Sequence, residues 1–262
     1  MCSPGSYQPN SAQTSCNSAS VGHYVAIYAA TAQTPCSLGT YQPMTGQATC
    51  LDADPGHYVG TTGSGSQTQC TPGNYQSLPG QNKCDLASPG HYVDTYAATV
   101  QTACVAGTYN PSNSSIESND CLSADPGNSV PIEGSPYQTP CTEGHYQPYS
   151  GQTSCLDADP GHYVNSSGAT SQDQCALGQF QSQSGQISCS DSDSGHYVDV
   201  VAASSQTPCP QGTYNLNTGS TNSSECIAAD SGYHVPTEGS TGQVACPAGT
   251  YQNQTGQSAC TE

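Results

Sequence analysis

The sixteen cysteines of this chain fall in a regular rhythm. From Cys2 to Cys260 their separations alternate between 14 and 20 residues, and the shorter interval lengthens to 17 twice, at Cys104–Cys121 and Cys209–Cys226. A fixed period of this length is typical of tandem repeats in which each unit contacts mainly its neighbours. The sequence therefore predicts one tandem array over residues 1–262, with repeats 2–35, 36–69, 70–103, 104–140, 141–174, 175–208 and 209–245 and a half-repeat 246–262.

Composition excludes a conventional hydrophobic core. Leucine, isoleucine, valine and phenylalanine number 8, 5, 13 and 1, together 27 of 262 residues, which is well under the ~20% below which chains tend to stay disordered. Units with so little apolar surface are usually held by disulfides, which persist in oxidising compartments. We therefore expect an extracellular or cell-surface localisation. Because Met1 leads directly into an in-phase repeat, we also expect a segment of a longer secreted chain.

The strongly negative net charge of the chain limits the classes of partner that it can bind. The chain has 19 carboxylates, a single basic side chain, Lys83, and a formal net charge of −18. Binding to nucleic acids or to anionic membranes needs clusters of lysine and arginine, which this sequence lacks. No apolar run approaches the ~20 residues of a membrane span. We expect no nucleic-acid partner, no membrane span in this segment and no cofactor.

Each repeat divides into two similar halves. In the first half the opening cysteine is followed by a glycine and an aromatic residue, as in Cys36, Gly39 and Tyr41. In the second half a small residue takes the place of the cysteine, as in Ala53, which precedes Gly56 and Tyr58. Both halves also close on a glutamine three residues before a cysteine.

The repeated half predicts a hairpin. Glycine tolerates positive φ, so a recurrent glycine beside proline marks a tight turn, and short alternating segments such as 57–59 favour brief strands. The aromatic residue is the only large side chain in each half, so we expect it to lie over a disulfide and to supply most of the local apolar burial. The expected fold class is a small disulfide-rich β structure, an elongated tandem-repeat rod of short hairpins and loops with almost no helix.

Parity and spacing leave two ways to pair the cysteines. If each first half closes its own loop, all sixteen cysteines are used. The alternative phase, which begins with Cys16 and Cys36, leaves Cys2 and Cys260 to find partners elsewhere. A loop of this size contributes about 3 kcal/mol per disulfide in the chain-entropy model.

The motif Cys-x-x-Gly-x-Tyr followed by Gly-Gln-x-x-Cys, as from Cys36 to Tyr41 and from Gly46 to Cys50, resembles the ephrin-receptor-like cysteine-rich repeat. It is also similar to the first half of a tumour-necrosis-factor-receptor module, and the resemblance covers the entire chain. It implies an elongated extracellular array whose units bond their opening cysteine to their closing one. The pairs it favours are Cys2–Cys16, Cys36–Cys50, Cys70–Cys84, Cys104–Cys121, Cys141–Cys155, Cys175–Cys189, Cys209–Cys226 and Cys246–Cys260.

One departure from this family concerns the second halves. The family usually places Cys-x-x-Cys between consecutive units, whereas here the second cysteine is replaced by Ala19, Ala53, Ala87, Ala124, Ala158, Ser192 or Ala229. Half of the usual disulfides are therefore missing. We expect the second halves to depend on stacking against the first.

Histidines and paired aspartates are the candidates for metal binding. The histidines lie a repeat apart with no second ligand at a motif distance, so we interpret them as turn residues beside tyrosine and not as metal ligands. The Asp-x-Asp pairs offer oxygen ligands for calcium, but a solvated acidic edge is the favoured interpretation. The histidines are His23, His57, His91, His145, His162, His196 and His234, and the pairs are Asp52 and Asp54, Asp157 and Asp159, and Asp191 and Asp193.

Catalysis has no recognisable apparatus in the sequence. No serine lies in a nucleophile-elbow pattern and no lysine or arginine is placed to stabilise an oxyanion, so we expect no enzyme. Four asparagines satisfy the N-glycosylation pattern: Asn113, Asn165, Asn222 and Asn253. Asn113 and Asn222 lie in the two 17-residue loops, where a glycan would shield a protruding loop.

Repetition, covalent closure and the near-absence of lysine and arginine favour a structural role. The leading hypothesis is a repeat segment of an extracellular fibre, stalk or sheath whose partners are copies of itself, the remainder of a longer repeat chain and covalent glycans. The alternative is a cell-surface recognition or adhesion ectodomain that binds a protein or glycan along its length. The divergent repeat 104–140 favours this alternative, and a calcium-stiffened adhesin is the third hypothesis.

Overall fold

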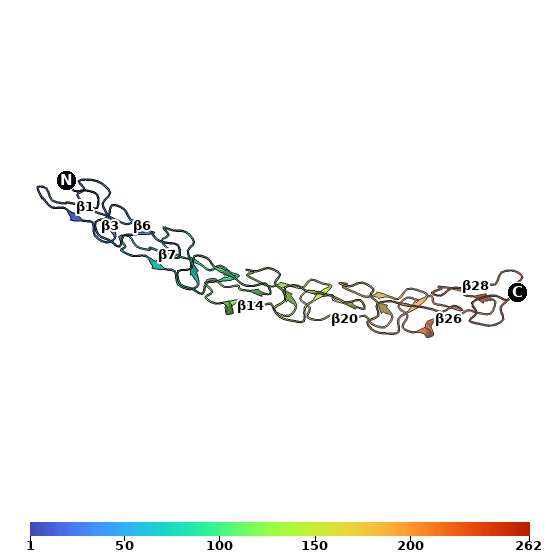
Figure 1. Ribbon diagram of the computed structural model, residues 1–262. Helices are drawn as coiled ribbons and strands as arrows, with labels where there is room; N and C mark the ends of the chain where they lie inside the picture. The colour runs from blue at the N-terminus through green and yellow to red at the C-terminus, as the bar shows by residue number, and fades with distance from the viewer. The chain divides into compact units, whose positions relative to one another are not determined.

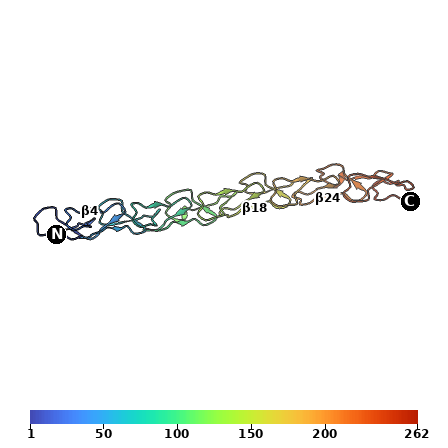
Figure 2. The ribbon, with the colours of Figure 1, turned by 90° about the horizontal axis from the view of Figure 1, so that it is seen from above.

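The computed structural model describes residues 1–262 as a series of two-stranded antiparallel hairpins, each formed by consecutive strands. The chain divides into two compact units, Met1–Ser123 with Val130–Gln138, and Ala124–Ser129 with Thr139–Glu262. Within each unit the hairpins follow one another in file along the chain (Figures 1 and 2). This arrangement within each unit confirms the expected disulfide-rich series of short hairpins.

The strands of unit 1 pair in sequence order. They are β1 (Ser6–Tyr7) with β2 (Asn17–Ser18), β3 (His23–Tyr24) with β4 (Thr34–Pro35), β5 (Thr40–Tyr41) with β6 (Leu51–Asp52), β7 (His57–Tyr58) with β8 (Thr68–Gln69), β9 (Asn74–Tyr75) with β10 (Asp85–Leu86), β11 (His91–Tyr92) with β12 (Thr102–Ala103), and β13 (Thr108–Tyr109) with β14 (Leu122–Ser123). One 3₁₀ turn, η1 (Ser118–Asp120), lies before β14.

Unit 2 repeats the same order. Its strands are β15 (Asn128–Ser129) with β16 (Thr139–Pro140), β17 (His145–Tyr146) with β18 (Leu156–Asp157), β19 (His162–Tyr163) with β20 (Asp173–Gln174), β21 (Gln179–Phe180) with β22 (Ser190–Asp191), β23 (His196–Tyr197) with β24 (Thr207–Pro208), β25 (Thr213–Tyr214) with β26 (Ile227–Ala228), and β27 (Tyr233–His234) with β28 (Val244–Ala245). The second 3₁₀ turn, η2 (Ser223–Glu225), precedes β26, and a single bridge joins Tyr251 to Thr261.

Each hairpin corresponds to one sequence half. The hairpin of β5 and β6 belongs to the first half of its repeat and the hairpin of β7 and β8 to the second, and we call such hairpins first-half and second-half hairpins. Both begin at a glycine turn. Gly39 has φ +80° and Gly56 has φ +79°, values that glycine adopts at little cost.

Backbone hydrogen bonds join each hairpin to the next. The N–H of Gly39 donates to the carbonyl of Val59 at 2.9 Å, and the carbonyl of Gly39 accepts from Ala53 N–H at 2.8 Å. The N–H of Gly63 donates to the Cys36 carbonyl at 2.8 Å. The same bonds recur along each unit. Since each sheet has only two short strands, these bonds between hairpins carry much of the backbone pairing that a wider sheet would supply.

The turn glycines also fit against the hairpin one full repeat further on. A Cβ placed on Gly39 would lie 2.0 Å from the carbonyl oxygen of Gly80, and one on Gly56 would lie 2.1 Å from that of Ala97. Real atoms do not approach this closely, so only glycine fits. The receiving residues also have positive φ, +70° at Gly80 and +53° at Ala97.

Small side chains and polar groups fill the interior. Cys36 and Ala53 are 0% exposed, and Val59 and Gln42 are 2% exposed. The hairpin aromatics, by contrast, are only half-buried, including Tyr41. The aromatic is therefore only partly covered, and the fully enclosed positions belong to the opening residue and the residue after the aromatic, as at Cys36 and Val59.

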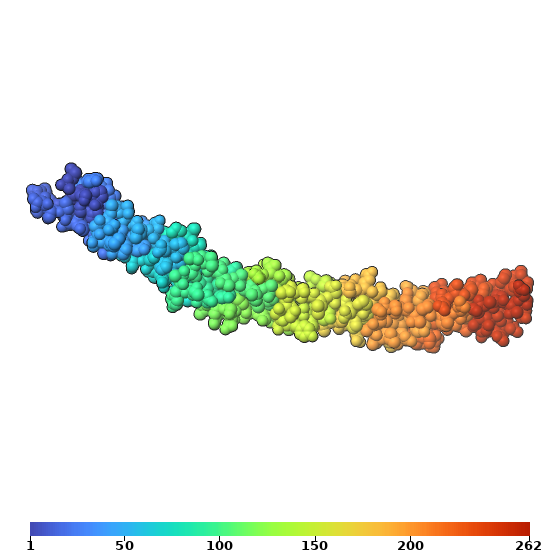
Figure 3. Space-filling view, in the orientation of Figure 1, coloured from blue at the N-terminus to red at the C-terminus, as the bar shows by residue number.

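The buried polar side chains are all satisfied. No buried side-chain nitrogen or oxygen lacks a hydrogen-bond partner, as is usual for native structures. The space-filling view shows closely packed hairpins and no deep cleft on the face that it presents of either unit (Figure 3). Candidate functional groups therefore lie at the hairpin ends, in the loops and in shallow hollows between hairpins.

Candidate functional site

Eight disulfides close the first-half hairpins. Their Cα–Cα distances lie between 5.6 and 5.8 Å, within the usual range for disulfides, and no cysteine is free. The bonded pairs are Cys2–Cys16, Cys36–Cys50, Cys70–Cys84, Cys104–Cys121, Cys141–Cys155, Cys175–Cys189, Cys209–Cys226 and Cys246–Cys260. With every thiol in a disulfide, the structure offers no thiolate as a nucleophile or metal ligand.

Second-half hairpins are closed by a hydrogen-bonded latch. In the hairpin of β7 and β8, the side-chain carbonyl of Gln67 accepts from the Asp54 N–H at 2.6 Å, and its amide donates to the Asp54 carboxylate at 2.6 Å. Gln67 stands where a first-half hairpin has its closing cysteine. The same latch joins Asp159 to Gln172, Asp193 to Gln206, and Asp230 to Gln243, while Ser88 takes the place of aspartate opposite Gln101 and Ser20 opposite Gln33.

The contact that this glutamine makes was not predicted from the sequence. The signal was its spacing: each latch glutamine lies 13 residues after its aspartate or serine. Side-chain pairing at that distance depends on the hairpin register, which the sequence had not fixed.

A second glutamine organises the first-half loops. The amide of Gln42, the residue after the aromatic, donates to the Thr49 carbonyl at 2.8 Å, and its oxygen accepts from Met44 N–H at 3.1 Å. The two 17-residue loops have asparagine here instead. The amide of Asn110 donates to the Ser115 hydroxyl at 2.7 Å, and Asn215 and Ser220 repeat the bond at 2.7 Å.

The three extra residues of each long loop form a 3₁₀ turn held by a carboxylate. In the first loop, the Asp120 carboxylate accepts from the N–H of Ile116 at 2.8 Å. In the second, Glu225 accepts from both the N–H and the hydroxyl of Thr221, at 2.7 and 3.0 Å. These hydrogen bonds, with the Thr221 N–H contributing most, lower the pKa of Glu225 below its usual value of 4.5.

The four sequon asparagines are all exposed but differ in their local roles. Asn222 caps η2, because its side-chain oxygen accepts from the N–H of Ser224 at 3.0 Å. Its amide nitrogen, the atom that would carry a glycan, lies 3.2 Å from the Thr221 hydroxyl. Asn113 lies at the tip of the first long loop, and Asn165 and Asn253 lie directly after buried or half-buried inner positions.

The recurrent histidines lie at the hairpin turns. The Nδ1 atom of His57 lies 3.3 Å from the Pro55 carbonyl oxygen, and that of His91 lies 3.2 Å from the Pro89 carbonyl oxygen. His23, His145, His162 and His196 make the equivalent approach. In addition, His145 Nε2 lies 3.1 Å from the Asp157 carboxylate. Each of these histidines is thus bound within its own hairpin.

In two of the three Asp-x-Asp pairs the two members make different contacts. Asp157 faces His145, whereas Asp159 forms a latch. Asp191 accepts from Gln179 at 2.9 Å, and Asp193 forms another latch. In the Asp52 and Asp54 pair, Asp54 closes the latch described above.

One group in the structure resembles a metal-binding cluster. The ligand atoms of His234, Cys246 and Cys260 lie within 4.8 Å of one another. The two cysteines, however, are bonded to each other, so their sulfurs are not thiolate ligands.

Burial perturbs one tyrosine hydroxyl. Desolvation is the main cause that raises the pKa of Tyr146 above its usual value of 10.0, and the negative charge of Asp159 adds to the effect. Tyr146 lies in β17 and pairs across the hairpin with Leu156.

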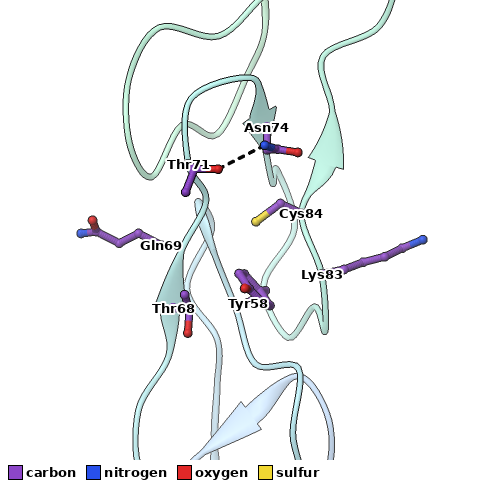
Figure 4. Close-up of a pocket in the computed structure, with 7 residues that line it drawn as sticks. All are labelled: Tyr58, Thr68, Gln69, Thr71, Asn74, Lys83 and Cys84. Atoms are coloured by element: carbon purple, nitrogen blue, oxygen red, sulfur yellow. Dashed lines mark hydrogen bonds between the residues drawn. The ribbon is translucent and has the colours of Figure 1, made fainter. Parts of the chain in front are cut away.

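Two similar hollows lie in unit 1, each between a second-half hairpin and the first-half hairpin that follows it. One has a volume of about 300 Å³ and is lined by Tyr58, Thr68, Thr71, Asn74 and Cys84, among others. Figure 4 shows the Tyr58 ring and the Cys84 sulfur projecting into it, while the Lys83 ammonium points away. The other, of about 440 Å³, is lined by the residues one repeat earlier, including Tyr24, Thr34, Ser37, Thr40 and Cys50.

Apolar side chains are exposed in repeat 104–140. Within unit 1, Ile132 is 67% exposed and Tyr137 is 70% exposed. Val105, Ile116 and Leu122 are also exposed.

No helix of the chain has both the length and the apolar character needed to cross a bilayer.

Comparison with known proteins finds one similarity. The family model described as tyrosine-protein kinase ephrin type A/B receptor-like matches residues 135–175, which contain the disulfide-closed hairpin of β17 and β18 and the latched hairpin of β19 and β20. No curated protein matches the chain. The chain is a cysteine-rich tandem repeat of disulfide-closed units, similar over residues 135–175 to this receptor-like cysteine-rich family.

Proposed function

We propose that this segment is a structural part of an extracellular fibre, stalk or sheath. The observation that carries the proposal is the chain of backbone hydrogen bonds from each hairpin to the next, as between Gly39 and Val59 at 2.9 Å. Turn glycines such as Gly39 and Gly56 also abut the hairpin one repeat further on, so these neighbouring repeats interlock. Repeat arrays of this kind resist local unfolding through neighbour interfaces rather than through one large core.

The chemistry of the chain suits persistence outside the cell. Eight disulfides lock the first-half loops, and oxidising compartments preserve such bonds. A chain with one lysine and no arginine also offers trypsin-like proteases a single site. We propose no catalytic role for the protein, because carboxylates such as Asp54, Asp159 and Glu225 serve latches and loop turns.

Self-association is the expected mode of assembly. Like-charged segments with a net charge of −18 repel one another at long range, and salt screens that repulsion. Contacts between copies would use the neutral tyrosine, glutamine, serine and threonine surface. Sedimentation of native material should therefore show larger particles as ionic strength rises. A single monomeric species at every salt concentration would contradict this mode of assembly.

Glycans are proposed on the exposed sequons, with Asn113 and Asn165 favoured over Asn222. Asn222 already caps η2 through its side-chain oxygen, so a glycan there would have to coexist with that cap. Asn253 is exposed as well. Mass spectrometry of glycopeptides from the secreted protein measures the occupancy of each site, and full occupancy at Asn222 alone would contradict this order.

Immuno-electron microscopy tests the structural role directly. Antibodies raised against the folded 262-residue chain should label a filament, stalk or sheath in the native extracellular material. Labelling should persist after washing with high salt and detergent, and it should be lost after reduction. Label that is confined to a detergent-soluble cell-surface fraction would contradict the proposal.

A recognition ectodomain is the second candidate. The exposed Ile132 and Tyr137 favour it, because exposed apolar side chains often mark protein contacts, and the matched family is receptor-like. This candidate predicts a monomeric chain that binds one soluble protein partner. Ile132→Ser with Tyr137→Ser would then abolish the binding, whereas the structural role predicts that sedimentation of the native assembly is unchanged.

A further inference from the structure

The two hollows of unit 1 have the same architecture. In each, a hairpin tyrosine and the closing cysteine of the next first-half hairpin face the same space: Tyr58 with Cys84, and Tyr24 with Cys50. Many of the other lining residues carry hydroxyl or amide groups, such as Asn74 and Thr40 at equivalent places, and the second hollow also has Ala26, Pro35 and Ala48 in its lining. A hollow that recurs after one repeat is a product of the repeat itself and not an irregularity of one loop.

The lining is neutral, aromatic and rich in hydrogen-bonding groups. None of the residues around either hollow is acidic, and the Lys83 ammonium, the only basic group, points away (Figure 4). Thr68 and Thr71 offer hydroxyls that both donate and accept, and the Asn74 amide donates to the Thr71 hydroxyl at 3.2 Å. One ring face framed by neutral donors and acceptors suits a ligand that has both apolar C–H faces and hydroxyl groups.

We propose that these hollows bind a neutral, β-linked polysaccharide, with one short stretch of sugar per repeat. Pyranose rings with equatorial substituents present flat C–H faces, which stack on tyrosine, and hydroxyls at their edges, which meet threonine and asparagine. Volumes of about 300 and 440 Å³ lie at the small end of ligand pockets. Acidic polysaccharides are disfavoured because the chain carries a net charge of −18.

A polymer fits better than an isolated sugar. Each hollow is shallow, so a single one binds weakly. Several sites on one chain that engage one polymer raise the apparent affinity without any new contact. Tyrosines equivalent to Tyr58 occur at Tyr24, Tyr92, Tyr163 and Tyr197.

Two second-half hairpins lack this aromatic and provide internal controls. In unit 2, Ser129 stands at the equivalent position, and its hydroxyl lies 3.7 Å from the Cys155 sulfur. His234 likewise places Nδ1 3.1 Å from the Cys260 sulfur. The residue at this position therefore faces the next closing cysteine in these hairpins too. Ser129, however, has no ring that could stack on a sugar. Sugar binding should therefore be absent at Ser129, and His234 places an imidazole where the other hairpins have tyrosine.

Titration with defined saccharides tests the proposal. The chain has no tryptophan, so tyrosine fluorescence of the full 262-residue chain reports on the tyrosines directly. Cellohexaose or chitohexaose should give a saturable change in emission, and a neutral β-glucan polymer, hydroxyethylcellulose, should bind at least about tenfold more tightly than cellohexaose. Heparin should give no change. If neither neutral hexamer binds, or if heparin binds equally well, the proposal is wrong.

Matched variants locate the binding. Replacing Tyr58 and its four sequence equivalents by alanine should weaken hydroxyethylcellulose binding at least about tenfold, whereas Tyr28→Ala with Tyr96→Ala, which removes two exposed tyrosines outside the hollows, should leave it unchanged. Ser129→Tyr should strengthen binding and does not depend on whether the five-alanine variant folds. Equal binding by the hollow and control variants, or no gain from Ser129→Tyr, would overturn the proposal. Neither result bears on the structural role, which immuno-electron microscopy tests separately.

Discussion

The hairpins 36–52 and 53–69 have nearly the same backbone but are closed in different ways. In the first, a disulfide joins Cys36 to Cys50. In the second, Gln67 holds the backbone and side chain of Asp54 through two hydrogen bonds of 2.6 Å. Both hairpins keep the glycine turn and the same backbone bonds to their neighbours. The comparison shows that the covalent bond is not what defines the hairpin.

The difference also shows how the hairpins without a disulfide are closed. A hydrogen bond contributes about 1 kcal/mol net, whereas a disulfide that closes a loop of this size contributes about 3 kcal/mol. Second-half hairpins should therefore be the weaker members of each repeat. We expect the backbone hydrogen bonds to the two disulfide-closed neighbours to compensate for this difference.

Removal of one disulfide should have the largest effect. Cys36→Ala with Cys50→Ala should destabilise hairpin 36–52 by about 3 kcal/mol, because the unfolded loop regains its freedom. Hydrogen exchange of the amides in 36–52 should speed up accordingly, while those in 141–174 stay protected. Loss of protection along the whole chain would contradict the picture of independent neighbour contacts.

A grafted latch sharpens this test. The triple variant Cys36→Ala, Ser37→Asp and Cys50→Gln gives hairpin 36–52 the residues of a second-half latch. It should be about 1 kcal/mol more stable than Cys36→Ala with Cys50→Ala. Non-reducing peptide mapping of the unmodified chain is the control for the pairing. A peptide that links Cys50 to Cys70 would refute the disulfide set on which the comparison depends.

Filling a turn glycine should rank next. Gly56→Ala places a Cβ 2.1 Å from the Ala97 carbonyl oxygen at φ +79°, so we expect a loss of about 2–3 kcal/mol from the clash and the backbone conformation together. Gly232 is the matched control, since it has φ +86° but no atom within 4 Å of an added Cβ. Gly232→Ala should cost only about 1 kcal/mol. Equal losses, measured by hydrogen exchange of the affected hairpins, would show that the interlock contributes nothing.

Removal of a latch should have a smaller effect. Gln67→Ala should destabilise hairpin 53–69 by about 1 kcal/mol, because the Asp54 N–H and carboxylate lose their partner. Gln47→Ala is the control, because the Gln47 amide makes only a local bond of 3.3 Å to Thr45, and it should change stability by less than about 0.5 kcal/mol. Protection of the β7 and β8 amides measures both changes. If the two variants behave alike, the latch does not replace the disulfide.

The smallest effect should be a pH dependence confined to the second long loop. Hydrogen bonds from Thr221 lower the pKa of Glu225 in the folded chain below its usual value of 4.5. Their contribution to stability is therefore fully present above pH 4.5 and is lost as the pH falls through the lower folded pKa. NMR shifts of the amides in 221–226 should follow this titration, and Glu225→Gln should remove it. If the titration persists in Glu225→Gln but disappears in Glu238→Gln, the titrating group is Glu238 and the prediction is wrong.

The repeats, the turns and the short strands can be predicted from local sequence signals. The cysteine period predicts the repeats, and glycines such as Gly39 and Gly56 predict the turns, because their backbone conformation depends mainly on their own residue type. The brief strand at His57–Tyr58 follows from its alternation and from the turn before it. Composition alone showed that no large core would form.

The tertiary structure decided which side chains meet. Tyr41 lies half-buried, while Gln42 beside it is enclosed. Gln67 reaches Asp54 across 13 residues, and Tyr58 reaches the hollow of Cys84 in the next hairpin. The first of these contacts depends on the strand register within a hairpin, and the second depends on the register between hairpins, which is fixed by backbone hydrogen bonds between segments about one half-repeat apart. A residue's own preferences carry no information about that register, so the sequence determined the hairpin and the packing of hairpins determined its surfaces.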